Sequence, residues 1–232
     1  MSIHLLHEVE KLKKRVLTLG ALVEEQVRKS VEAASKRDEK LAAEVIAADA
    51  EIDRMEVDIE EDCLKVLALY QVVAGDLRFI IAILKMNSDL ERIGDLAVNI
   101  AERAQFLSNL EPDEMPFNLR DMAAKAQAML KKSLDALVNR DVALAYRVCA
   151  ADEEVDNANR QAYAVLMEAV QKSPPRLKTL IHQFTAMRQL ERIADHATNI
   201  AEDVIYMLQG EIVRHRAEKY SRPEPPRPPQ KQ

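Results

Sequence analysis

The chain contains a thirteen-residue segment twice, and the repeat includes its charged residues. Residues 90–102 (LERIGDLAVNIAE) recur as residues 190–202 (LERIADHATNIAE), and only three of the thirteen positions differ. Packing tolerates almost any polar residue on a solvated face, so a repeat kept for its core would preserve the apolar positions alone. Because the Glu, Arg, Asp and Asn also recur, the sequence predicts two copies of one structural unit, each with the same polar surface feature.

The match extends beyond this segment. Residues 48–53 correspond to residues 151–156, at an offset of 103 instead of 100. The second copy is therefore three residues shorter in the connection where Ser173-Pro174-Pro175 replaces the stretch around Gly75. Loops tolerate such deletions better than the elements they join, so the sequence predicts a duplicated helical unit with one shortened loop.

The residue composition favours an all-α fold. The chain has only four Gly and no Trp, and five of its nine Pro lie in residues 223–229. Turn formers and aromatic strand residues are therefore scarce. We expect helices at residues 3–36, 38–71, 76–109, 118–139, 141–172 and 175–211. The expected N-caps are Asp38, Asp76, Asn118, Asp141 and Ser173, and Gly210 is the expected C-terminal stop.

Apolar residues recur along these helices at alternating steps of four and three. In the third helix they are Met86, Leu90, Ile93, Ala97, Ile100, Ala104 and Leu107, and in the sixth they are Ala186, Leu190, Ile193, Ala197, Ile200, Val204 and Met207. This spacing is typical of long helices packed at a shallow angle. Short connections make neighbours antiparallel, so we expect two tandem, pseudo-symmetric three-helix bundles. The first would occupy residues 1–112 and the second residues 117–212, followed by a basic, Pro-rich, disordered tail at 213–232.

Charge, hydropathy and cysteine content exclude several classes of protein. The net charge of −6 argues against broad nucleic-acid binding. The longest apolar runs, residues 79–84 and 162–167, are far shorter than the roughly 20 residues of a membrane span. Cys63 and Cys149 occupy non-equivalent positions, which favours two buried thiols in a reducing compartment. We therefore expect a cytoplasmic protein.

Acidic residues spaced four apart lie away from the apolar series. Residues i and i+4 of a helix project from the same side, so the third helix should carry an outward acidic stripe. Its members are Glu91, Asp95, Asn99 and Glu102, repeated in the sixth helix as Glu191, Asp195, Asn199 and Glu202. The preceding helix of each bundle carries a second stripe, formed by Asp49, Asp53, Glu56 and Glu60 in the first copy and by Asp152, Asp156 and Asn159 in the second.

Two interpretations of these stripes are open. They are ordinary solvated surface, or they form metal sites. Carboxylates at i and i+4 repel by a few tenths of a kcal/mol, so a repeated pair is mildly costly unless something offsets it. If antiparallel neighbours bring the two stripes of a bundle together, their carboxylates would form a hard-ligand cation site, with Asn99 as a neutral oxygen donor. His196 could add a nitrogen ligand in the second copy.

Nothing in the sequence points to catalysis. A carboxylate-bridged di-iron enzyme would need Glu-x-x-His residues in the bundle core, and neither half contains that motif. The chain also has no Gly-rich phosphate loop, nucleophile elbow or Cys/His array. We therefore expect a protein that is not an enzyme.

The doubled segment resembles the PhoU family of phosphate-signalling regulators. Glu-Arg-Ile-Gly/Ala-Asp followed by Asn-Ile-Ala-Glu, duplicated in an all-helical chain of this length, is similar to the family's motif. The Asp-x-Glu-Ile/Val-Asp segments at residues 49–53 and 152–156 also fit. The resemblance covers the chain except for its Pro-rich tail.

The resemblance implies a pair of three-helix bundles with multinuclear iron or zinc clusters bound at the surface. The implied ligands are Asp49, Asp53, Glu91 and Asp95 in the first copy and Asp152, Asp156, Glu191 and Asp195 in the second. It also implies a cytoplasmic homodimer that negatively regulates phosphate uptake and the phosphate-starvation response. Its implied partners are the ATPase subunit (PstB) of the phosphate ABC transporter and the sensor histidine kinase PhoR, so it would meet the membrane only through partners.

Two alternative functions stay open. The first is a carboxylate protein for metal storage or redox chemistry, which redox turnover would identify. The second is an accessory helical module of a low-affinity phosphate permease, which genomic neighbours would separate from the transporter regulator.

Overall fold

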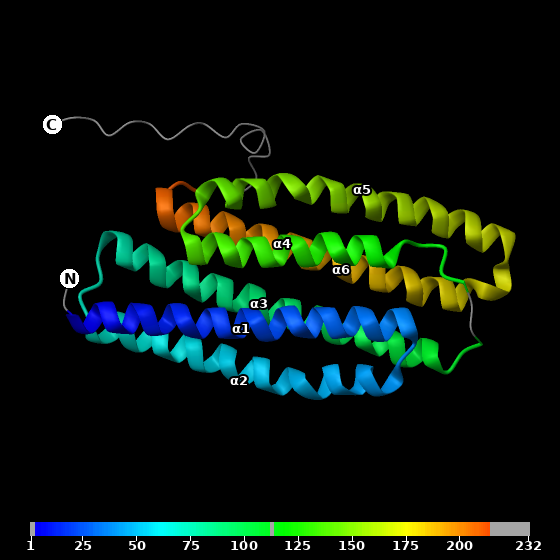
Figure 1. Ribbon diagram of the computed structural model, residues 1–232, viewed down its shortest axis with the longest axis horizontal. Helices are drawn as coiled ribbons and strands as arrows, with labels where there is room; N and C mark the ends of the chain where they lie inside the picture. Colours follow the sequence, from blue (N-terminus) through cyan, green and yellow to red (C-terminus); the bar gives the residue numbers. More distant parts are fainter. Residues whose placement is uncertain (1–2, 112–113, 214–232) are drawn as a thin grey trace.

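The structure, a computed structural model, describes residues 3–111 and 114–213. This part of the chain folds into long helices and contains no strand. The helices are α1 (Ile3–Lys36), α2 (Glu39–Leu69), α3 (Ala74–Ser108), α4 (Leu119–Asn139), α5 (Val142–Lys172) and α6 (Leu177–Gln209), with a short 3-10 turn, η1 (Pro174–Arg176), before α6. The expected all-α fold is therefore confirmed (Figure 1).

Local side-chain chemistry sets most of the helix ends. Asp38 accepts hydrogen bonds from the first-turn N–H groups of α2, and Asn118 and Asp141 do the same for α4 and α5, as expected. Gly210 ends α6 with φ +74°, the left-handed conformation that glycine adopts without strain. The expected cap at Asp76 is wrong, because α3 begins at Ala74 and Asp76 lies inside its first turn. Ser173 precedes η1 but makes no side-chain capping bond.

The apolar series form the core as expected. Every member of the series in α3 and α6 is buried, and Ile93 and Ile193 are both fully buried. In the first bundle α1, α2 and α3 pack against one another, and in the second α4, α5 and α6 do so. Two three-helix bundles therefore follow one another in the chain. Cys63 and Cys149 are buried, and burial raises the pKa of each thiol to about 12.

The two bundles pack side by side and share one core. The main contact between them runs along α3 and α6, with a smaller one between α1 and α4. Figure 1 shows α3 and α6 running in opposite directions, so the repeats are related by a pseudo-two-fold axis between these helices. Polar contacts follow the same antiparallel register. Lys85 near the start of α3 lies 3.3 Å from Asp203 near the end of α6, and Arg103 near the end of α3 lies 3.5 Å from His182 near the start of α6.

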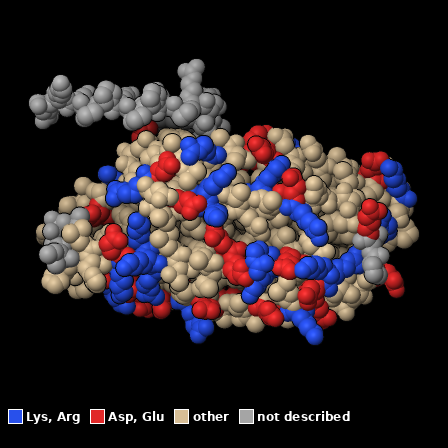
Figure 2. All heavy atoms as spheres, in the orientation of Figure 1, with Lys and Arg blue, Asp and Glu red and all other residues tan. Residues whose placement is uncertain are grey.

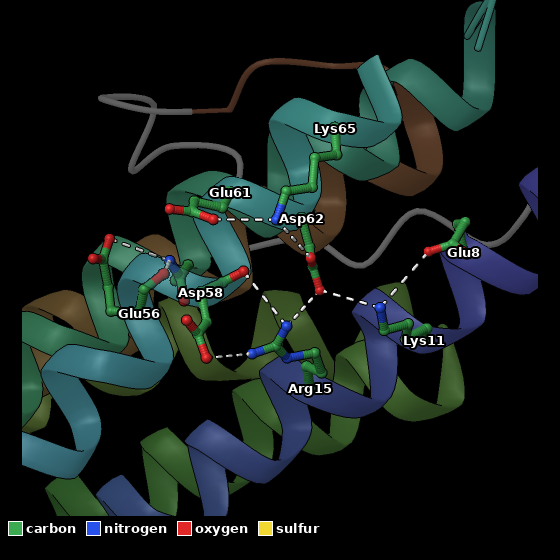
Figure 3. Close-up of polar contacts among 9 residues, drawn as sticks. Glu8, Lys11, Arg15, Glu56, Asp58, Glu61, Asp62 and Lys65 are labelled. Carbon is green, nitrogen blue, oxygen red and sulfur yellow. Dashed lines mark hydrogen bonds and ion pairs between the residues drawn. The ribbon is translucent and has the colours of Figure 1, made fainter. Parts of the chain in front are cut away.

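Ion pairs connect α1 with α2 on the outer side of the first bundle. Arg15 of α1 reaches two carboxylates of α2, with Asp58 at 3.1 Å and Asp62 also in direct contact (Figure 3). Lys11, one turn earlier, lies 3.4 Å from Asp62. The lysines and arginines on the face in Figure 2 are likewise interspersed with acids. Within the described residues, none of the helices has the length and apolar content that crossing a membrane requires.

Candidate metal centre

Three carboxylates of the second bundle converge where α5 and α6 lie side by side. Asp152 and Asp156 are four residues apart on α5, and Asp195 faces them from α6. One oxygen from each lies within 4.8 Å of the other two. We call these three residues the second carboxylate cluster. Among the residues that the structure describes, no other group of three acidic, histidine or cysteine side chains lies so close together in a way that suits a metal ion.

The environment of this cluster disfavours its negative charge. Burial raises the pKa of Asp152 to about 6, and the neighbouring Asp156 and Glu191 add to the rise. Asp195 is partly exposed, but the side of its carboxyl group that faces α5 is buried. This burial, and next the negative charge of Asp152, raise the pKa of Asp195 to about 6 as well. Such mutual repulsion is what a bound cation would relieve, because it favours the ionised form of each carboxylate.

Several oxygens around the second carboxylate cluster also lack a partner. Asp152 Oδ1 and Asn159 Oδ1 are buried and accept no hydrogen bond from the described part of the chain. The Thr198 hydroxyl lies close enough to lower the pKa of Asp152, but it completes no hydrogen bond of normal geometry. Buried polar atoms without a partner are rare in proteins. The oxygen-rich site is therefore suited to a hard cation, which would accept these lone pairs.

The first bundle brings the equivalent acids together less tightly. Asp49 and Asp53 of α2 face Glu91 and Asp95 of α3, and we call these four residues the first carboxylate cluster. Burial raises the pKa of Asp49, a hydrogen bond from Gln26 partly offsets this, and Asp53 and Asp95 raise it further. Burial also raises the pKa of Glu91, and the charge of Asp95 adds to the effect. Acids from the two stripes of a bundle therefore lie close together in both copies, which is the condition that the metal interpretation requires.

Neutral donors occupy some of the oxygens in the first bundle. Gln26 Nε2 of α1 lies 3.2 Å from Asp49 Oδ1. Asn87 Nδ2 of α3 donates to the Glu56 carboxylate at 3.2 Å. Sequence reasoning missed both residues, because neither has a polar counterpart in the other copy: Met129 and Met187 stand at the equivalent positions. The only signal in the sequence was that each of the two is a polar residue on the apolar side of its helix.

A glycine lets α2 approach α3 closely in the first bundle. A Cβ added at Gly94 would lie 3.3 Å from Ile52 and 3.4 Å from Asp49 Oδ1. Ala194 takes this position in the second copy. The two clusters are therefore similar in composition and different in detail.

The remaining candidate ligands point elsewhere. Glu102 is exposed and pairs with Arg103 at 3.1 Å, whereas Glu202 is only 7% exposed. The expectation that Glu202 belongs to an outward stripe is wrong, because this part of α6 packs on both sides and places Glu202 close enough to the buried Cys149 to raise the pKa of its thiol. Asn99 is half-buried and has no contact that assigns it to the first carboxylate cluster.

Two further candidates in the second copy face the other bundle. The Nδ1 atom of His196 lies 2.7 Å from Asp89 Oδ1 of α3, and Asn199 Nδ2 donates to the same oxygen at 3.2 Å. These contacts tie α6 to α3. The polar contact of both side chains is therefore with Asp89, although His196 stays close enough to Asp195 to lower the pKa of that carboxyl in part.

Comparison with known proteins gives the same result for both bundles. A family model described as "PhoU domain" matches residues 16–104 and residues 119–204, one match in each bundle. A "phosphate-specific transport system accessory protein PhoU homolog" of Aquifex aeolicus is 42% identical over 211 residues, which cover 91% of this chain and 96% of that protein. A protein of the same description from Pseudomonas aeruginosa is 39% identical over 211 residues, which cover 90% of this chain and 86% of that protein.

Solved structures agree. The crystal structure of PhoU from Pseudomonas aeruginosa superposes with a TM-score of 0.86 at 38% identity, covering 88% of this chain and 99% of that one. The phosphate transport system regulatory protein PhoU from Streptococcus pneumoniae superposes with a TM-score of 0.80 at 31% identity, covering 90% and 99%.

Proposed function

Because the chain belongs to the PhoU family, we propose that it is an accessory protein that regulates phosphate transport. The observation that carries this proposal is the match of each bundle, residues 16–104 and 119–204, to the family's domain. More specifically, we propose a negative regulator of phosphate uptake and of the phosphate-starvation response. It would act as a cytoplasmic homodimer without catalytic activity and bridge the ATPase subunit of the phosphate transporter and its sensor histidine kinase.

The proposal includes a metal ion at each carboxylate cluster, with the second cluster the better prepared of the two. Its support is the short separation of Asp152, Asp156 and Asp195, together with the buried Asp152 Oδ1 that has no hydrogen-bond partner among the described residues. A donor set made of oxygen alone favours a hard ion such as iron over zinc, which prefers nitrogen and sulfur. When bound, the metal supplies positive charge that offsets the repulsion among the carboxylates.

The architecture suits an adaptor. The two bundles are joined along α3 and α6 by a continuous core, so surfaces on different bundles belong to one rigid body. Two weak binding surfaces on one body raise the effective concentration of each partner for the other. The carboxylate clusters would steer a basic partner surface by charge, and metal occupancy would set how much charge they present.

A deletion strain tests the regulatory role. Without this gene, and with no second copy present, phosphate-scavenging genes should be expressed in rich phosphate. Wild type and the exposed control Glu154→Gln should restore repression, whereas the combined variant Asp152→Asn, Asp156→Asn and Asp195→Asn should not. The purified chain should also co-elute with the transporter ATPase or the kinase. Normal repression in the deletion strain would contradict the proposal and favour the metal-storage alternative.

A further inference from the structure

The repeat places an arginine in the same unusual conformation after the first helix of each bundle. Arg37 and Arg140 both adopt the left-handed region, with φ of 55° and 52°. The residue that follows each arginine makes the same hydrogen bond, at 3.0 Å, back into the preceding helix. The two loops are therefore copies of one structure. They lie at opposite ends of the molecule, because α1 and α4 end on opposite sides (Figure 1).

The two arginines nevertheless have different surroundings. The Arg37 guanidinium donates to the carbonyls of Leu107, Leu110 and Glu111, so it holds the end of α3 and the start of the linker between the bundles. The Arg140 N–H donates to the Ala136 carbonyl, but its side chain makes no hydrogen bond or ion pair within residues 3–111 and 114–213. The second copy has thus kept the arginine and its backbone geometry without the backbone acceptors.

Arg140 lies on the wall of a cavity of about 210 Å³. The cavity is at the end of the molecule where α1 and α3 begin and where α4 and α6 end, at the left of Figure 1. Two more cations line it, Arg78 of α3 and Lys13 of α1. The rest of the wall is largely apolar and includes Val9, Phe79, Leu137, Met207 and Leu208.

Arg78 is held in place without a polar partner. Its Nε atom is buried and makes no hydrogen bond within the described residues. Gly210, at the end of α6, lies beside this side chain: a Cβ added there would be in ordinary van der Waals contact with the guanidinium carbon, at 3.7 Å. Arg78 as a whole is half-buried, but a buried N–H without an acceptor is costly, and an anion in the cavity would supply that acceptor.

The charge and the size of the cavity define the ligand. Three cations face two carboxylates, Glu10 and Asp76, which leaves one net positive charge. The first turn of α3 also lines the cavity at Gly75 and Asp76, and the Val73 cap of that helix provides no side-chain hydrogen bond. The Asp76 N–H donates to the Val73 carbonyl at 3.2 Å, so the helix adds positive potential mainly through its dipole. Pockets for drug-sized ligands measure about 300–1,000 Å³. A smaller space suits a compact anion.

We propose that this cavity binds a single phosphate group, with Arg78 and Arg140 as the main donors and Lys13 as a third. The planar guanidinium matches the oxygens of phosphate in pairs, so two arginines can hold one tetrahedral anion. Free inorganic phosphate fits the volume of the cavity. This site lies apart from the carboxylate clusters and goes beyond the proposed adaptor function.

Calorimetric titration of inorganic phosphate into the full chain tests the site. The chain is first treated with a chelator, and the titration is repeated with Asp152→Asn, Asp156→Asn and Asp195→Asn, because phosphate could otherwise bind a metal at the second carboxylate cluster. Ionic strength is kept constant. We expect saturable binding in both backgrounds, which would be independent of whether the adaptor function holds.

Charge variants then locate the site. Arg78→Met and Arg140→Met should each weaken binding by about tenfold or more, since each removes a charge-assisted contact. Lys178→Met is the matched control, because Lys178 is the repeat counterpart of Arg78 at the other end and stacks over Phe106 instead. It should bind as wild type does. Glu10→Gln should bind more tightly, because it removes a competing carboxylate.

Three results would overturn the proposal. One is the absence of saturable phosphate binding by wild type in millimolar titrations. Another is equal weakening by Lys178→Met, which would indicate non-specific attraction. The third is tighter binding of adenosine monophosphate than of inorganic phosphate, which would contradict a compact-anion site. Arg140 is exposed, so its variant should fold normally, and thermal melts of each variant check this.

Discussion

The Lys85 ammonium of α3 lies 3.3 Å from the Asp203 carboxylate of α6, across the contact between the two bundles. Asp203 is only 2% exposed, whereas 39% of the Lys85 side chain reaches solvent. The lysine stem also passes the Tyr206 ring, with Nζ 5.3 Å from its centre. This pair therefore places a buried negative charge at the interface that makes one body of two repeats.

Lys85→Met should weaken the contact between the bundles. The variant removes a charged donor from a buried carboxylate, which costs about 1–3 kcal/mol of unfolding free energy. Lys65→Met is the control, because Lys65 pairs with Glu61 on an exposed face and such pairs contribute little to stability. Denaturant melts measure both. Equal losses would mean that the interface pair behaves as an ordinary surface pair.

The buried series of α3 and α6 should provide most of the stability. Ile93→Ala or Ile193→Ala removes a fully buried side chain and should cost about 2–5 kcal/mol. The exposed Glu102→Ala should change stability by about 0.5 kcal/mol or less. If these variants melt at the same denaturant concentration, the helical phase assigned to α3 and α6 is wrong.

Glu202 and Glu102 occupy equivalent positions and should respond differently to truncation. Glu202 is buried near Cys149, so Glu202→Ala should destabilise the fold by about 1–3 kcal/mol. Glu102→Ala has no such effect, because Glu102 stays in solvent beside Arg103. Chemical denaturation of the two single variants gives the comparison. A cost for Glu102 as large as that for Glu202 would contradict the difference in burial.

Glu102 and Glu202 also show how much of the structure can be predicted from the sequence. Side-chain capping by Asp38, Asn118 and Asp141 and the spacing of the apolar series predicted the helices and the bundles, because both depend on local chemistry. The repeated acids raised the possibility that the two stripes of a bundle meet, and the family resemblance implied Asp152 and Asp195 as ligands of one site. A repeat, however, predicts only the direction in which a side chain projects from its own helix. The burial of Glu202 depends on the packing of a second helix against α6, which its sequence alone does not specify.

The contacts of His196 have the same explanation. Its position next to Asp195 made it a candidate ligand, but Asp89 of α3 lies within hydrogen-bond distance of its ring. That contact exists only because α3 and α6 pack antiparallel between the bundles. Likewise, Gln26 and Asn87 bind acids of the first bundle from positions where the other copy has methionine, so the repeat could not identify them.

The metal-free protein should become more stable as the pH falls from 7 towards 4. Burial raises the pKa of Asp152 and of Asp195 to about 6, against an ordinary 3.8, so the folded state binds protons that the unfolded state does not. Folding is then favoured below the folded pKa, and the gain is lost as the pH rises through about 6. Because these carboxylates are partly exposed, solvent screening limits the effect to the order of 1 kcal/mol per group.

Asn variants test the origin of this pH dependence. Asp152→Asn or Asp195→Asn should stabilise the metal-free chain at pH 7 and flatten its stability profile between about pH 4 and 6. Urea melts across this range measure the profile, with the exposed Glu154→Gln as a control. An unchanged slope in both Asn variants would show that other groups cause the pH dependence.

The metal content of the reconstituted chain measures the role of the carboxylate clusters directly. Elemental analysis after loading with iron and removal of free metal compares wild type, the Asp152→Asn, Asp156→Asn and Asp195→Asn variant, and the Glu154→Gln control. We predict that the triple variant loses the more tightly bound metal and keeps its helicity, while the control retains wild-type content. A triple variant with the metal content of wild type would contradict a metal centre between α5 and α6.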